Sequence, residues 1–164
     1  MTSPGQGFHV TAVTLLTNTS RTDESRYGST ITPKAFTSAF ASNAPPSEIR
    51  THFTSQDDRI LVFEHGLPQL APFLGRAFRG ADGLAQYLGI VSECLSFEDM
   101  RFGGDGDGDG DGDGDGGGYV VDAEARTVAV RGAARFTWRS TGQSWDEMFV
   151  YVLAFDGECK VERR

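Results

Sequence analysis

Cysteine is scarce in this sequence, since its 164 residues include two, Cys94 and Cys159. Two cysteines are too few for a disulfide framework, and neither belongs to a pair with metal-binding spacing. Both are therefore expected to be reduced thiols, which is the usual state inside cells. On this basis we predict a cytoplasmic location.

Long hydrophobic runs and basic clusters are also missing. No apolar run approaches the roughly 20 residues of a membrane span. The N-terminal "VTAVTLL" is not preceded by the basic residue that a secretory signal requires. The formal net charge is −8, and no basic patch is present that would attract phosphate groups. We therefore expect neither a membrane nor nucleic acid as a partner.

The hydrophobic residues that are present, 38% of the chain, suffice for the core of one domain. Residues 1–32 are rich in serine, threonine and glycine, which predicts a loose N-terminal arm. The alternative for part of this arm is a strand in "FHVTAVTLL". The globular domain is expected over residues 33–164.

The segment 103–118 alternates glycine with six aspartates, and without these acids the net charge of −8 would be −2. On paper the segment fits a calcium loop with ligands at Asp111, Asp113, Asp115 and Asp122. The twelfth ligand of such loops is usually glutamate, however, and no helix is predicted to follow. Alternating glycine also raises the entropic cost of ordering the segment. We therefore predict a disordered insertion between two strands and no metal site.

Three helices are predicted in the first part of the domain. The first is "PKAFTSAFASN", in which Phe36 and Phe40 share one face. The second lies in "APPSEIRTHF", with Ile49 and Phe53 as its buried pair. The third is "ADGLAQYLGIVSECLSF", which Asp82 can cap. Its apolar stripe consists of Leu84, Leu88, Val91 and Leu95.

Strands make up the remainder. "DRILVFEHG" predicts a strand that ends at Gly66, and a covering loop, "LPQLAPFLGRAFRG", follows it. "FEDMRF" and "YVVDAEA" flank the insertion, and "ECKVERR" is expected to form the closing strand. Two long strands alternate strictly. The first places Val128, Val130, Ala134, Phe136 and Trp138 on one face, and the second does so with Trp145, Glu147, Phe149, Tyr151, Leu153 and Phe155. This order of elements predicts an α+β fold, with helices on one face of a curved antiparallel sheet.

The strand ending "VFEHG", the helix "FRGADGLAQYL" and the closing "WRSTGQSWDEMFVYVLAFDGECKVERR" resemble the SnoaL-like family of the nuclear-transport-factor-2-like superfamily. The resemblance covers about residues 33–164. It implies a cone-shaped curved antiparallel sheet packed against three helices, with an apolar pocket between them. Members of this family include polyketide cyclases, ketosteroid isomerases, small dehydratases, epoxide hydrolases and non-catalytic binding domains. Many form dimers through the outer face of the sheet.

On such a fold, two residues are candidates for moving a proton. His65 ends the first strand, where a neutral imidazole could act as base or could simply bond to the backbone. Glu147 faces the pocket if its strand face is concave, and there an apolar environment would raise its pKa. If that face is convex, Glu147 meets solvent or a dimer partner instead. Both are named as catalytic candidates.

Four aromatic residues are candidates for binding substrate. Tyr87 and Tyr151 could donate hydrogen bonds to a carbonyl or enolate oxygen, although tyrosine on an apolar face is also a common core residue. Trp138 and Phe149 are expected to form a dry pocket wall.

The function expected from these residues is binding of a hydrophobic small molecule, with cofactor-free isomerisation, cyclisation or dehydration as the chemistry. The alternative is a non-catalytic binding or dimerisation module. A homodimer is expected through Met148, Val150 and Val152, which lie on the opposite face from Phe149.

Overall fold

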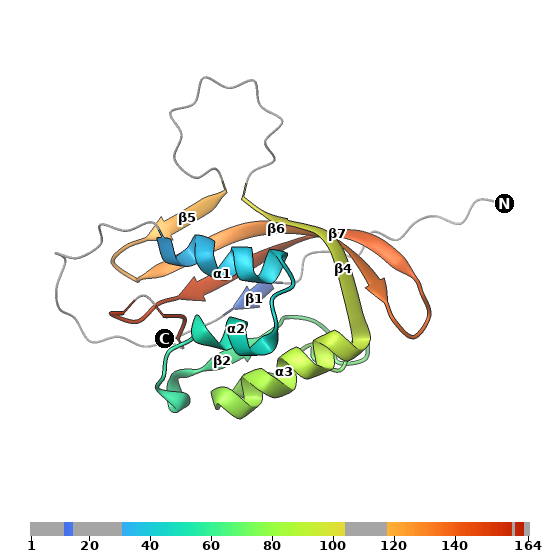
Figure 1. Ribbon diagram of the computed structural model, residues 1–164, viewed down its shortest axis with the longest axis horizontal. Coiled ribbons are helices and arrows are strands. Elements are labelled where there is room, and N and C mark those ends of the chain that lie inside the picture. The colour runs from blue at the N-terminus through green and yellow to red at the C-terminus, as the bar shows by residue number, and fades with distance from the viewer. Residues whose placement is uncertain (1–11, 15–30, 104–117, 159, 163–164) are drawn as a thin grey trace, which may run out of the picture.

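The computed structural model describes residues 12–14, 31–103, 118–158 and 160–162 (Figure 1). Its helices are α1 (Ile31–Ala41), α2 (Pro46–Thr51) and α3 (Gly80–Cys94), with one 3-10 turn, η1 (Asp57–Arg59). Its strands are β1 (Ala12–Thr14), β2 (Leu61–Phe63), β3 (Ala77–Arg79), β4 (Leu95–Phe102), β5 (Tyr119–Asp122), β6 (Thr127–Trp138) and β7 (Ser144–Ala154). The architecture is α+β, as predicted.

A long hairpin of β6 and β7 forms the centre of the main sheet. The two strands pair antiparallel from Thr127 opposite Ala154 to Thr137 opposite Ser144. The sheet order is β1-β7-β6-β4, and β5 also pairs with β6. β1 lies parallel to β7, so part of the segment expected as a loose arm forms an edge strand instead. The other residues before Ile31 lie outside the described part of the chain.

β4 and β5 lie end to end along the same edge of β6 (Figure 1). Phe102, the last residue of β4, pairs with Gly132, and Tyr119, the first residue of β5, pairs with Val130. Between them, the backbone N–H of Gly103 donates to the carbonyl of Arg131 at 2.9 Å. The aspartate-glycine segment was expected to connect two adjacent strands. It instead interrupts a single line of pairing, at one position of β6. Residues 104–117 themselves lie outside the described part.

The start of α3 differs from the prediction. The backbone N–H of Ala81 donates to Asp57 Oδ1 at 2.6 Å, so a carboxylate from η1 caps the helix. Asp82, the expected cap, lies within the first turn of the helix and does not cap it. The helix also ends earlier than expected, at Cys94, because Leu95 already pairs with Trp138 in the sheet.

A short β2–β3 pair forms a second sheet beside α3. Val62 lies opposite Phe78, and both side chains are buried. β3 falls in the stretch that was expected to be only a covering loop. The closing strand, by contrast, is reduced in the described residues to isolated bridges, in which Val161 pairs with Phe53 and with Phe155.

The core lies between the helices and the inner face of the main sheet. Phe36 of α1, Ile49 of α2 and Leu84 of α3 are at most 3% exposed. On α3, Tyr87 is buried as well, whereas Leu88, Val91 and Leu95 of the predicted stripe are half-buried. The helix therefore turns its Leu84–Tyr87 side towards the sheet, and this rotation brings a tyrosine hydroxyl into the interior.

Candidate functional site

The inner face of β7 carries three of the predicted site residues. Phe149 is buried, and Glu147 and Tyr151 are half-buried. Met148, one position along, is 61% exposed on the outer face. The predicted face of this strand is therefore confirmed.

Five aromatic rings, which we call the aromatic wall, cover this inner face in a continuous series. Trp145 stacks on Phe136 with ring centroids 5.9 Å apart, and Phe136 lies 6.1 Å from Phe149. Phe149 lies 5.1 Å from Tyr151, which in turn lies 5.3 Å from Phe102. Four of the five rings are half-buried, and only Phe149 is fully buried. A ligand could therefore reach much of the aromatic wall without unfolding the domain.

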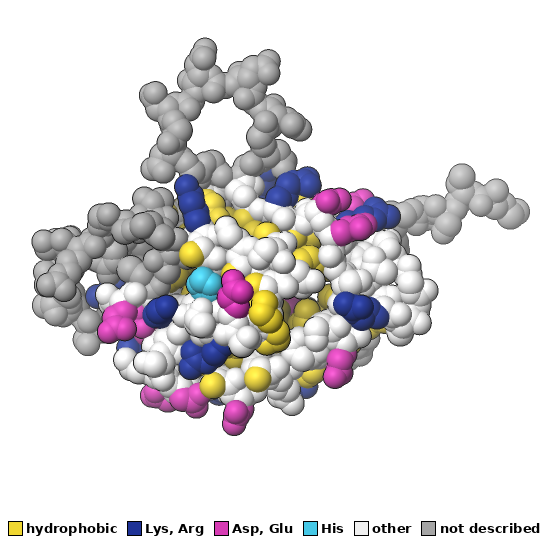
Figure 2. All heavy atoms as spheres, viewed as in Figure 1, with side chains coloured by type: hydrophobic (Ala, Val, Ile, Leu, Met, Phe, Trp, Pro, Cys, Tyr) yellow, Lys and Arg dark blue, Asp and Glu magenta, His cyan; other side chains and the backbone are white. Residues whose placement is uncertain are grey.

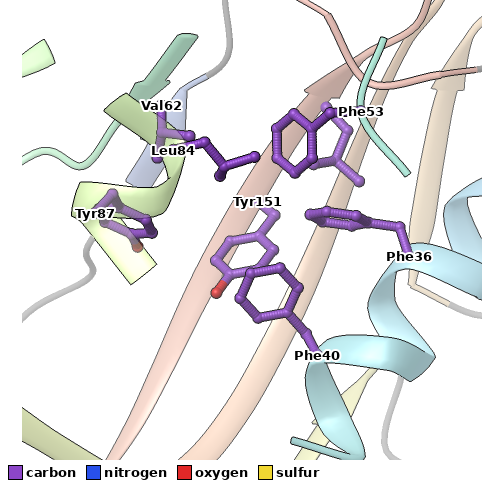
Figure 3. A pocket seen from close by; sticks show the side chains of 8 residues that line it. Phe36, Phe40, Phe53, Val62, Leu84, Tyr87 and Tyr151 are labelled. Atoms are coloured by element: carbon purple, nitrogen blue, oxygen red, sulfur yellow. The ribbon is translucent and has the colours of Figure 1, made fainter. Parts of the chain in front are cut away.

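A small cavity lies at one end of the aromatic wall, where α1 and α3 approach β7. Figure 3 shows Tyr151 at its centre, between Tyr87 of α3 and the rings of Phe36 and Phe40 of α1. The cavity volume is about 20 Å³, which is room for about one water molecule. Its lining is Phe36, Phe40, Phe53, Val62, Leu84, Tyr87, Tyr151 and Leu153. In the space-filling view, hydrophobic side chains reach the surface in the gap between α1 and α3 (Figure 2).

Glu64 is a carboxyl group bonded to one of the residues that line this cavity. It directly follows β2, and strand alternation sends its side chain to the same side as Val62, which lines the cavity. The hydroxyl of Tyr87 donates a hydrogen bond to Glu64 Oε2 at 2.9 Å. The carboxyl group is thus fixed next to the cavity by a partner that itself lines it.

The surroundings of Glu64 change its pKa strongly. The pKa of Glu64 is raised from 4.5 to about 7. Burial is the largest cause of this rise; the hydrogen bond from Tyr87 opposes it, and the charge of Glu147 adds to it. A carboxyl group with this pKa exchanges a proton readily near neutral pH, which general acid–base catalysis requires.

Both tyrosines remain neutral hydrogen-bond donors. Burial, followed by the charge of Glu64, raises the pKa of Tyr87 and that of Tyr151 above the ordinary value of 10. The Tyr151 hydroxyl makes no hydrogen bond to the part of the chain that the structure describes. It is therefore free to donate to a ligand oxygen.

Glu147, a predicted catalytic residue, lies within the aromatic wall. Its Oε2 accepts a hydrogen bond from Trp145 Nε1 at 2.8 Å. Its charge raises the pKa of Glu64, so the carboxyl group on β7 acts electrostatically on the one at the end of β2. The structure therefore brings Glu147, Tyr87, Tyr151 and Phe149 to one region of the fold.

His65 and Trp138 lie apart from the cavity. His65 is exposed, and its ring packs edge-on against Phe63 at 4.8 Å, because alternation along β2 turns both away from the Glu64 side. Trp138 is half-buried, two positions beyond Phe136 on the same face of β6. The expected meeting of His65 and Glu147 in one cavity is thus not seen, and the residue on which the charge of Glu147 acts is Glu64.

Glu64 was not predicted, because the ordinary pKa of the neighbouring His65 lies closer to neutral pH than that of a glutamate. A signal was available, since Val62 and Glu64 share a face in "ILVFEHG" just as Glu147 and Phe149 do on the later strand. The alternation rule applied to both strands would have placed both carboxyl groups inside.

The described residues contain no group of three or more His, Cys, Asp or Glu side chains that could hold a metal ion. Asp122, considered above as a calcium ligand, accepts a hydrogen bond from the Ala125 backbone N–H at 2.8 Å in the turn after β5. The six aspartates of the repeat, three of which belong to the calcium formula, lie outside the described residues. No helix in the described part of the chain is both long enough and apolar enough to cross a membrane.

Three helices on the inner face of a curved sheet, with a cavity between them, define a nuclear-transport-factor-2-like (NTF2-like) fold. Comparison with one solved structure supports this fold. An NTF2-like protein of unknown function from Exiguobacterium sp. 255-15 superposes with a TM-score of 0.52 at 14% identity, over 79% of this chain and 91% of that one. A ketosteroid isomerase-like protein from Erwinia carotovora atroseptica SCRI1043 gives a TM-score of 0.48 at 21% identity, over 80% and 85% of the two chains. No protein-family model and no curated protein sequence matches the chain.

Proposed function

We propose that this chain is a SnoaL-like domain that binds a hydrophobic small molecule along the aromatic wall and carries out acid–base chemistry on it without a cofactor. The observation that supports this most directly is the Glu64–Tyr87 pair, a carboxyl group with a pKa of about 7 held beside an apolar cavity. Isomerisation, cyclisation and dehydration all require such a group.

In this proposal Glu64 is the proton carrier. Above pH 7 its carboxylate removes a proton from a carbon next to a ligand carbonyl group, and the same carboxyl group then returns the proton at a second position. Negative charge develops on the carbonyl oxygen during the first step. The Tyr151 hydroxyl, which lines the cavity, can donate a hydrogen bond to that oxygen. Tyr87 holds Glu64 in place throughout.

The two catalytic candidates from the sequence have different places in this scheme. Glu147 acts on the proton affinity of Glu64 through its charge, and it remains a candidate for contact with the ligand. His65 lies on the outer side of the Glu64 segment, so a role for it requires proton transfer through solvent. We also propose a cytoplasmic location. This proposal is based on the scarcity of cysteine in the sequence, and Cys94 is a free thiol.

The proposal can be tested without knowing the natural substrate. We would follow exchange of the α-protons of a bicyclic aromatic ketone, 2-tetralone, in deuterated buffer by NMR. The wild-type protein should accelerate exchange, with a rate that rises with pH and levels off above about 7. Glu64→Gln should lower this rate by about 10²–10⁴-fold. His65→Gln, which changes an exposed neighbouring residue, serves as the control and should retain the activity.

The alternative is a binding module without catalysis. The small size of the cavity, about 20 Å³, favours it, because a substrate must displace side chains or bind along the half-buried wall. In that case 2-tetralone would bind, exchange would match the buffer rate, and Glu64→Gln would change neither.

A further inference from the structure

The aromatic wall has a property that the proposed chemistry does not use. Aromatic ring faces carry partial negative charge and attract cations, most strongly for tryptophan. Trp145, Phe136 and Tyr151 are half-buried, so their rings remain partly accessible. The wall is therefore suited to an apolar ligand and, in addition, to a positively charged one.

The two carboxyl groups at the wall favour the same kind of ligand. Glu147 lies on β7 between Trp145 and Phe149, and Glu64 reaches the space from the end of β2. Tyr87 from α3 bonds to Glu64, and Glu64 interacts electrostatically with Tyr151 and Glu147 of β7, while His65 follows it with its ring against Phe63. The charged side chain that acts on the Glu64 carboxyl group is thus another acid.

A ligand's charge decides how it interacts with this arrangement. An anionic group placed between two carboxylates is repelled by both, and a neutral group leaves their mutual repulsion unchanged. A cationic group relieves that repulsion and also gains the attraction of the rings. Partial burial strengthens all these effects, because water screens the charges less there.

We propose that the ligand of this site carries a positively charged nitrogen, as an amine or quaternary ammonium group, held between Glu64 and Glu147 against the aromatic wall. This inference rests on the proposed function for the location of the site, and it specifies the class of molecule. The apolar part of the ligand lies along Phe149 and Phe136, and the cationic group lies nearest Glu147. Glu64 then remains next to the atoms that exchange a proton.

Three probes of similar size test the proposal: benzylammonium, benzyl alcohol and benzoate. Their affinities for the full-length protein would be measured at pH 8 by isothermal titration calorimetry. Benzylammonium should bind at least about 10-fold more tightly than benzyl alcohol, and benzoate should not bind. Its affinity should fall by up to about tenfold per pH unit below 7, because the cation favours ionised Glu64. Titrations in two buffers of different ionisation enthalpy should show a proton released on binding near pH 7.

Variants locate the effect. Glu64→Gln should remove the pH dependence and the proton release. Glu147→Gln should lower the affinity for benzylammonium by about tenfold and leave the affinity for benzyl alcohol unchanged. Asp146→Asn is the matched control, because it removes a charge from the next position of β7, on the outer face, where Asp146 pairs with Arg135 at 3.1 Å. Circular dichroism would establish that each variant is folded.

Several results would overturn the inference. These are equal affinity for the three probes, preference for benzoate, or failure of benzylammonium to bind at millimolar concentration. The outcome of the ketone-exchange experiment does not depend on the outcome of these binding measurements. Cation-selective binding without exchange would remove the proposed chemistry and keep the ligand class, whereas exchange without cation selectivity would do the reverse.

Discussion

Glu64 is a half-buried acid whose proton affinity is linked to folding. In the unfolded chain its pKa is close to 4.5, and in the folded protein it is about 7. Between these values the folded protein binds more protons than the unfolded chain does, so stability must fall as the pH rises through this range. Above pH 7 the contribution is constant, because Glu64 is ionised in both states.

This gives a prediction for unfolding. From pH 4.5 to 7, Glu64 should lower the free energy of unfolding by about 3 kcal/mol, in order of magnitude. Glu64→Gln cannot ionise and should remove this slope, so the variant gains stability relative to the wild type as pH rises. Urea unfolding of both proteins at pH 4, 5.5, 7 and 8 measures the difference. Glu124→Gln, at an exposed position, should leave the slope intact, and parallel curves for wild type and Glu64→Gln would show that Glu64 is not the group responsible.

Among the elements, the β6–β7 hairpin positions the aromatic wall through one close approach. Gly132 of β6 lies directly opposite Phe149 of β7, and a Cβ atom at Gly132 would overlap the Phe149 ring. The missing side chain thus lets the ring lie against the backbone of β6. Phe149 in turn contacts Phe102 at 5.7 Å and Tyr151 at 5.1 Å, so its place sets the line of the wall.

Gly132→Ala is therefore expected to destabilise the protein by about 1–3 kcal/mol, because the Phe149 ring must move. Adding Phe149→Leu should recover part of this loss, and a double-mutant cycle in urea measures the coupling. Gly89→Ala on α3 is the control, since its new methyl group meets no atom within 4 Å. In a helix this substitution should be neutral or stabilise by up to about 1 kcal/mol. Equal effects at the two glycines would contradict the proposed contact.

On the scale of the whole molecule, the outer face of the sheet is available for self-association. We propose a homodimer through Met148, Val150 and Val152; Met148 is 61% exposed, and the two valines are half-buried. Arg135 lies on the same face and bridges Glu98 and Asp146, which provides a polar border to the apolar residues. Sedimentation equilibrium at micromolar concentration should give twice the chain mass of 17.7 kDa. Met148→Lys should shift the protein to the single-chain mass, and a wild-type protein that sediments as one chain would end the proposal.

The aspartate-glycine segment separates β4 from β5, which pair with the same edge of β6. Phe102 belongs to the aromatic wall, and the Tyr119 hydroxyl bonds to Thr37 of α1 at 2.7 Å, so both residues face inward. With residues 104–118 deleted, Gly103 would join Tyr119 directly, opposite Arg131, and the alternation of faces would be kept. The deletion should leave the melting temperature unchanged or raise it, by the equivalent of up to about 2 kcal/mol of loop-closure entropy. Calcium should not affect the intact protein; a calcium-dependent rise that the deletion abolishes would mean that the repeat binds metal.

Much of the sheet followed from the sequence because alternation is a local property. Which face of β6 and β7 is buried could be predicted from neighbouring residues alone. The same applies to Ile49 and Phe53, which are both buried as predicted. What could not be read locally were contacts between distant segments. Asp57 caps α3 from 24 residues away, and Tyr87 reaches Glu64 across 23 residues. The residues next to each partner in the sequence give no indication of these contacts.

The candidate site shows the same division. Tyr87, Phe149, Tyr151 and Glu147 were predicted individually, each from its own element, and the structure gathers them in one region. The acid that completes the arrangement was overlooked, because its pKa depends on burial and on a charge from another strand. Such quantities arise only when the helices close over the sheet.

The position of the aspartate-glycine segment also bears on how the gene can change. A tandem repeat readily gains or loses whole units when DNA is copied, and elsewhere in a strand an added residue would turn every following side chain to the opposite face. Here Gly103 bonds to Arg131 of β6, and pairing resumes with Tyr119 opposite the neighbouring Val130, so the number of residues between Gly103 and Tyr119 does not set the register. Alleles with more or fewer Asp-Gly units should therefore encode the same fold and the same site, differing in net charge by one for each unit.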